Sequence, residues 1–137
     1  MKKLFMALMA TLVMVSCGGS NSTTPEQFID DSIAAMESFN SKAERAINND
    51  DPEAFVKAFE EFAGTMRELK EVAESFEDNY SPAELEEEKE RLKEKMERGE
   101  SVGEKFEEFM NKAKRKLDFS SSQMKRLENA AALFGGF

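Results

Sequence analysis

The stretch DPEAFVKAFEEFAGTMRELKEVAESFEDNY, residues 51–80, decides the fold class. Its apolar residues recur at alternating steps of four and three, which is the period of a helix that buries one face. This seam is formed by Phe55, Phe59, Phe62, Met66, Leu69, Ala73, Phe76 and Tyr80. A seam of this kind is typical of a helix that packs in a bundle. The stretch therefore predicts one long helix with helical neighbours.

Similar seams lie on both sides of this stretch. One runs through Ile29, Ile33, Met36, Phe39, Ala43 and Ile47, and a shorter one through Met124, Leu127, Ala131 and Phe134. Short polar links at residues 48–51 and 78–81 favour antiparallel neighbours. The sequence thus predicts a single all-α domain over residues 24–137, built as an antiparallel bundle of three long helices plus a short C-terminal helix.

Capping residues mark where four helices begin. Thr24, Asp51 and Ser81 each precede a proline, and Ser120 begins the run Ser-Ser-Ser-Gln. A side-chain oxygen at such a position satisfies a free amide of the first helical turn, and proline suits the position that needs no amide. These starts divide the domain in the same way as the apolar seams.

The third helix has a weakly apolar middle around Gly99 and Gly103, which we interpret as a candidate hinge. Glycine lowers helix stability by about 1 kcal/mol relative to alanine, so two glycines four residues apart need a reason. One interpretation is a single helix that bends or packs closely there. The other is a break after Gly99 with a new start at residues 101–104. The apolar seam keeps its phase across both glycines, which favours the first.

Residues 1–16 have the features of a secretory signal peptide. A positively charged start precedes an apolar run over residues 4–15, which is shorter than the roughly 20 residues of a membrane-spanning helix. The run ends in Met14-Val15-Ser16-Cys17, which resembles the lipobox of bacterial lipoproteins. That resemblance implies cleavage between Ser16 and Cys17 and lipidation of Cys17.

The same resemblance implies a location. Gly18, and not an aspartate, follows Cys17, which in this family points to the outer membrane of the cell envelope. Residues 17–23 would then be the lipidated cysteine and a short flexible tether of small polar residues. The alternative is ordinary cleavage after Ser20, which would discard Cys17.

Composition excludes several classes of function. The formal net charge is −9, and removal of the two lysines in residues 1–16 lowers it to −11, which disfavours nucleic acid as a partner. The chain contains no histidine and one cysteine, so imidazole chemistry and an internal disulfide are impossible. We therefore expect no catalytic residues, no metal and no cofactor.

We expect two partners. One is the membrane, which the chain would contact through its lipid anchor, and the other is a second envelope protein. The leading hypothesis is a non-catalytic accessory lipoprotein that acts through protein–protein interaction. The alternative is a periplasmic chaperone or carrier that holds unfolded clients or an apolar ligand. A hinge at the glycines would expose an apolar strip beside basic residues, and this candidate interaction surface comprises Phe106, Phe109, Met110, Lys112, Arg115 and Lys116.

Overall fold

The structure, a computed structural model, describes residues 24–133. The signal peptide, Ser16, Cys17 and the tether therefore lie outside the described residues. Throughout the described part, all regular structure is helical, which confirms the predicted all-α class. The elements are α2 (Pro25–Asn48), α3 (Pro52–Glu74), α4 (Phe76–Asn79), α5 (Pro82–Arg91), α6 (Lys93–Lys116) and α7 (Ser121–Ala132).

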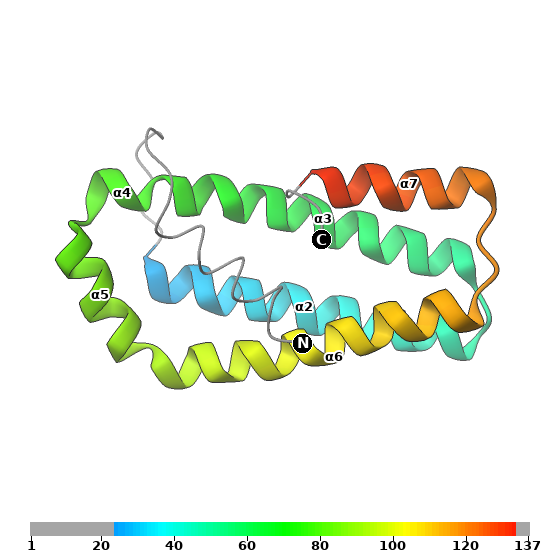
Figure 1. Ribbon diagram of the computed structural model, residues 1–137, viewed down its shortest axis with the longest axis horizontal. Coiled ribbons are helices and arrows are strands. Elements are labelled where there is room, and N and C mark those ends of the chain that lie inside the picture. The colour runs from blue at the N-terminus through cyan, green and yellow to red at the C-terminus, as the bar shows by residue number, and fades with distance from the viewer. Residues whose placement is uncertain (1–23, 134–137) are drawn as a thin grey trace.

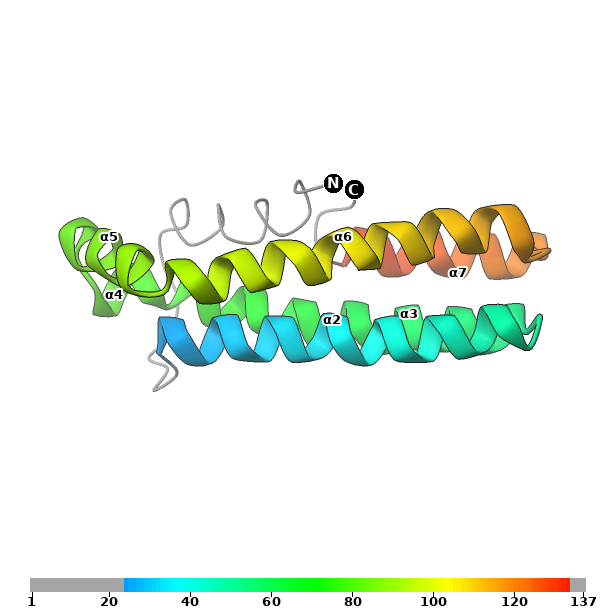
Figure 2. The same ribbon diagram turned by 90° about the horizontal axis from the view of Figure 1, so that it is seen from below.

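The long helices form two layers (Figure 2). α2 and α3 make an antiparallel hairpin, and α6 and α7 both lie on the same side of this hairpin. α6 packs mainly on α2, and α7 packs on α3. No described helix covers the other side of the α2–α3 hairpin, which we call its outer face.

The connection between the layers differs from the sequence prediction. The short link at residues 78–81 predicts that the third helix lies beside α3. In the structure, α4 and α5 carry the chain across one end of the bundle, and α6 then packs on α2 (Figure 1). Consecutive long helices still run in opposite directions, but α6 runs parallel to α2 and α7 runs parallel to α3.

All four predicted helix starts are confirmed. The side-chain oxygens of Thr24, Asp51, Ser81 and Ser120 each accept a hydrogen bond from the backbone amide three residues further on. At Ser120 the cap is reciprocal, because the side chain of Gln123 accepts a hydrogen bond of 2.9 Å from the Ser120 amide. Each start thus supplies an acceptor for an amide that the helix itself leaves free.

The predicted third helix is divided, although not at its glycines. A turn at Leu92 separates α5 from α6, and α6 continues through Gly99 and Gly103, which are both buried. The Leu92 amide donates to the Glu88 carbonyl at 2.9 Å, and the Leu92 carbonyl accepts from the Met96 amide at 3.0 Å. The helix is therefore interrupted at Leu92, which itself keeps one hydrogen bond to each side, and the glycines lie in regular helix.

The hydrophobic core lies between the two layers and centres on Phe39. The centroid of its ring is 4.7 Å from that of Phe106 and 5.6 Å from those of Phe55 and Phe62. All four side chains are at most 3% exposed. The seam predicted for residues 51–80 is buried from Phe55 to Ala73 in α3 and at Phe76 in α4, which confirms the apolar face assigned to this stretch.

Candidate docking groove

The candidate interaction surface predicted from the sequence is corrected by the burial of Phe106. This side chain is fully buried, and its ring lies 4.7 Å from the rings of Phe39 and Phe62. Phe109 and Met110 are half-buried and pack against the core. Phe106 is buried because the periodicity of the helix places it on the same face of α6 as the buried Ala113. These apolar residues therefore do not form an exposed strip.

The basic part of that predicted surface is accessible. Arg115 and Lys116 are exposed in the last turn of α6, and Lys112 is half-buried one turn earlier. Cations at this end of a helix interact favourably with its dipole. Their position is therefore explained by the helix itself, without a partner.

The structure instead shows a groove on the outer face of the α2–α3 hairpin, which we call the outer groove. Its volume is about 540 Å³. Six apolar residues form its floor, and seven residues with mostly exposed side chains form its rims. The floor comprises Ala35, Phe39, Ala58, Phe62, Leu69 and Val72. The rims comprise Asp31, Ala34, Ser38 and Lys42 on α2, and Glu61, Thr65 and Glu68 on α3.

Residue spacing explains why the outer groove forms. On α2 the lining residues follow steps of three and four, so they share one side of the helix, and the same holds on α3. Several of them are small, including Ala34, Ala35, Ser38 and Ala58. Where two packed helices carry small residues along their outer edge, a furrow remains between the helices.

The rims carry an excess of negative charge. Lys42 and Glu61 form an ion pair that joins α2 to α3 at one end of the outer groove. Asp31 accepts a hydrogen bond of 2.9 Å from the Gln27 side chain. Within residues 24–133, neither Asp31 nor Glu68 forms an ion pair with a lysine or arginine. Two carboxylates on the rims therefore remain available to a cation from outside.

The apolar seams of the sequence do not indicate the outer groove. The seams mark the face that points into the core, whereas the groove lies along the edge of that face. Ala34, Ala35 and Ser38 are the available signal, since three small residues lie there on the partly exposed side of an otherwise well-packed helix. These small residues indicate a groove only if α3 lies beside them, and only the structure shows that it does.

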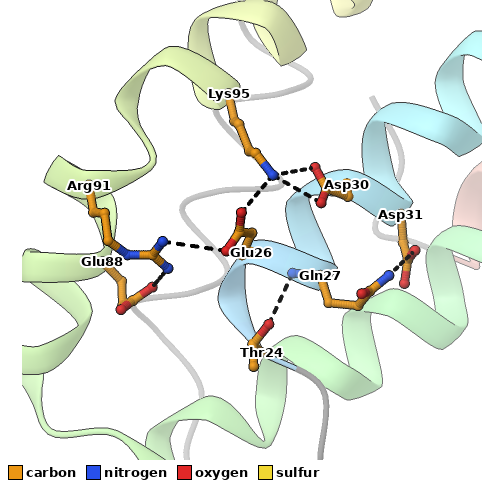
Figure 3. Close-up of polar contacts among 8 residues, drawn as sticks. All are labelled: Thr24, Glu26, Gln27, Asp30, Asp31, Glu88, Arg91 and Lys95. Carbon is orange, nitrogen blue, oxygen red and sulfur yellow. Dashed lines mark hydrogen bonds and ion pairs between the residues drawn. The ribbon is translucent and has the colours of Figure 1, made fainter.

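A second polar feature ties the two layers together near the start of α2 (Figure 3). Lys95 Nζ lies 2.7 Å from Glu26 Oε1 and 3.1 Å from Asp30 Oδ2. Arg91 is 2.6 Å from Glu88 and 3.4 Å from Glu26. This ion-pair cluster holds the bend between α5 and α6 against the first turns of α2.

Further ion pairs join the layers elsewhere. Arg98 lies 2.7 Å from Glu37. Arg126 on α7 lies 2.8 Å from Glu53 and also binds Glu60, both on α3. In these pairs between the layers, the acid belongs to the α2–α3 hairpin and the base belongs to α5, α6 or α7. This division of acids and bases between the layers helps to specify which helix faces pack together, although each exposed ion pair contributes little to the free energy of folding.

The ion pairs shift the pKa values of their carboxyl groups. A hydrogen bond from Lys95 lowers the pKa of Glu26 below its ordinary value of 4.5, and one from Arg126 lowers the pKa of Glu53 in the same way. Such a group stabilises the fold at pH above its unfolded-state pKa, and this contribution is lost as the pH falls through the lower pKa of the folded state.

We therefore expect the melting temperature to decrease on acidification below pH 4.5. Glu26→Gln should make this decrease smaller, because the variant no longer takes up that proton on unfolding. Glu87→Gln is the control, since Glu87 is exposed on α5 and forms no ion pair with any described residue. Melting curves followed by circular dichroism across this pH range measure the effect. An equal pH dependence in both variants would show that the Glu26 cluster does not contribute.

Within residues 24–133, no group of three or more His, Cys, Asp or Glu side chains is placed to hold a metal ion. None of the described helices combines the length and the apolarity needed to cross a bilayer.

Comparison with known proteins finds no matching family model, no matching curated protein and no matching solved structure.

Proposed function

We propose that this chain is a non-catalytic accessory lipoprotein of the bacterial envelope that is anchored by Cys17 and acts by binding another envelope protein. The observation that carries this proposal is the outer groove. Its apolar floor lies on the face of the α2–α3 hairpin that no described helix covers (Figure 2). A concave apolar surface with polar rims is a usual feature of binding sites.

The lipid anchor and the outer groove would lie close together. α2 begins immediately after the cap Thr24, and the first groove residue, Asp31, comes two helical turns later. The tether between Cys17 and Thr24 can extend to at most about 25 Å. A protein bound in the outer groove would therefore be close to the membrane surface, which supports a membrane protein or another anchored protein as the partner.

The carrier hypothesis is the second candidate. A volume of about 540 Å³ is in the range of sites for small molecules, and this observation favours it. Such sites, however, enclose most of the surface of their ligand. The outer groove is a furrow between two helices with exposed carboxylates on its rims, and this arrangement suits a polypeptide better than an apolar molecule.

Photocrosslinking in the native envelope tests the proposal. A photoreactive amino acid at Ser38 lies on the rim of the outer groove, and one at Ser101 on α6 is a matched control at an exposed serine outside the groove. We expect a discrete protein adduct from position 38 only. A small-molecule adduct at position 38 would favour the carrier instead. Protein adducts of equal yield at both positions, or none at either, would contradict docking in the groove.

A further inference from the structure

We infer that the occupant of the outer groove is a basic amphipathic helix of the partner protein. This inference rests on the proposed docking function and names the chemistry of the partner. The groove extends from Asp31 to Lys42 along α2, which corresponds to about 16 Å at 1.5 Å per residue. That length matches about three turns of a docked helix. A furrow between two helices is a surface that an apolar helix face commonly occupies.

The size of the lining side chains supports a helix. Ala35 and Ala58 contribute to the floor, and Ser38 and Thr65 stand on opposite rims. Small side chains at these positions leave room for an incoming helix to approach α2 and α3 closely. Of the larger floor residues, Phe39, Phe62 and Leu69 are buried, and Val72 is partly exposed and available for apolar contact. An apolar ridge with small to medium side chains therefore fits the groove.

Charge decides which helix fits. Asp31 and Glu68 form no ion pair with a described lysine or arginine, and Glu61 is paired only with Lys42 across the groove. Lysine or arginine residues on both sides of the apolar ridge would meet these three carboxylates. Complementary charges of this kind fix orientation and exclude wrong partners more than they add affinity.

The same charges disfavour two other occupants. A second copy that docked through its own outer groove would bring Asp31 and Glu68 of each chain against the acidic rims of the other, and like charges opposed in this way repel. An anionic lipid surface would be repelled for the same reason. A basic helix is the occupant whose charge matches both rims.

The test uses the lipidated protein in nanodiscs of neutral phosphatidylcholine, with empty nanodiscs as a blank. The probe is a synthetic amphipathic helical peptide that has an alanine and leucine ridge flanked by lysines, and binding is followed by fluorescence anisotropy. The double variant E61K/E68K reverses the charge of one rim. E87K/E90K makes the same net charge change at exposed positions on α5, outside the groove.

We expect E61K/E68K to weaken binding of the basic peptide by about tenfold or more, and E87K/E90K by less than about twofold. A peptide with glutamates in place of its lysines should bind E61K/E68K better than the unaltered protein. Circular dichroism verifies that each variant is folded. The rescue by the acidic peptide is a result that a damaged fold could not produce.

Three results would overturn the inference. Equal weakening by both double variants would mean that the peptide binds the acidic surface as a whole. Equal binding of the basic and acidic peptides would show that charge does not contribute to recognition of the peptide. Self-association of the protein, detected by sedimentation and abolished by E61K/E68K, would identify a second copy as the occupant. A groove-specific protein adduct at Ser38 together with any of these results would preserve the docking function and reject the basic helix.

Discussion

Phe106→Ala should lower the free energy of unfolding by about 3–5 kcal/mol, the usual cost of removing a buried phenylalanine ring. Phe106 is 0% exposed, and its ring centroid lies 4.7 Å from those of both Phe39 and Phe62. Removal of the ring leaves a cavity at the contact between α6 and the α2–α3 hairpin. Domains of this size are stable by about 5–15 kcal/mol, so the loss is a large part of the total.

Urea unfolding followed by circular dichroism measures this loss. Met124→Ala is the control. The sequence places Met124 on the apolar seam of α7, but the side chain is 43% exposed, so its truncation should change stability by no more than about 0.5 kcal/mol. If both variants unfolded at the same urea concentration as the unaltered protein, Phe106 would not belong to the core. The exposed strip predicted from the sequence would then regain its support.

Cys17→Ala should abolish fatty acid labelling of the protein, since Cys17 is the only cysteine in the chain. Several acyl chains on one residue give stable anchoring, because each buried methylene contributes about 0.8 kcal/mol. A companion variant, in which an ordinary cleavable signal peptide replaces residues 1–17, should therefore be recovered in the soluble fraction. Labelling with radioactive fatty acid and membrane fractionation measure the two effects.

Ser20→Ala is the control for this experiment, and it should leave labelling unchanged. The intact mass of the unaltered mature protein decides between the two cleavage sites. A chain that begins at a lipidated Cys17 agrees with the lipobox. An unlabelled chain that begins at Asn21 would show that Cys17 is discarded, and the membrane anchor would have to be abandoned.

Local chemistry made four helix starts predictable. The caps at Thr24, Asp51, Ser81 and Ser120 depend only on residues within a few positions of each other, and all four form as expected. The buried face of α3 was equally predictable, because the regular spacing of its phenylalanines admits one apolar face.

The bend at Leu92 was not predictable from local signals. Neither glycine nor proline lies there, and Leu92 occupies an ordinary position in the apolar seam. The structure associates the bend with tertiary contacts, namely the burial of Leu92 and the ion pairs that Arg91 and Lys95 make with Glu26. Glycines draw attention as candidate hinges, yet a buried glycine in a helix can equally serve packing.

The positions of α6 and the outer groove were unpredictable for a related reason. The sequence suggests that helices linked by a short turn are neighbours, but α4 and α5 form a crossing that places α6 on α2. The outer groove depends in turn on which edges of α2 and α3 remain uncovered. Such features are properties of the assembled layers and of no single helix.

The most direct test of the central claim combines the anchor and the groove in one crosslinking experiment. A photoreactive amino acid at Ser38 is introduced into the lipidated chain and into the soluble variant that lacks Cys17, and adducts formed in intact cells are sequenced. We predict an adduct with a partner segment whose apolar ridge is flanked by lysine or arginine, formed by the lipidated chain and strongly reduced in the soluble variant. Adducts of equal yield from both chains, or a partner segment without basic residues, would contradict an anchored protein that docks a basic helix in its outer groove.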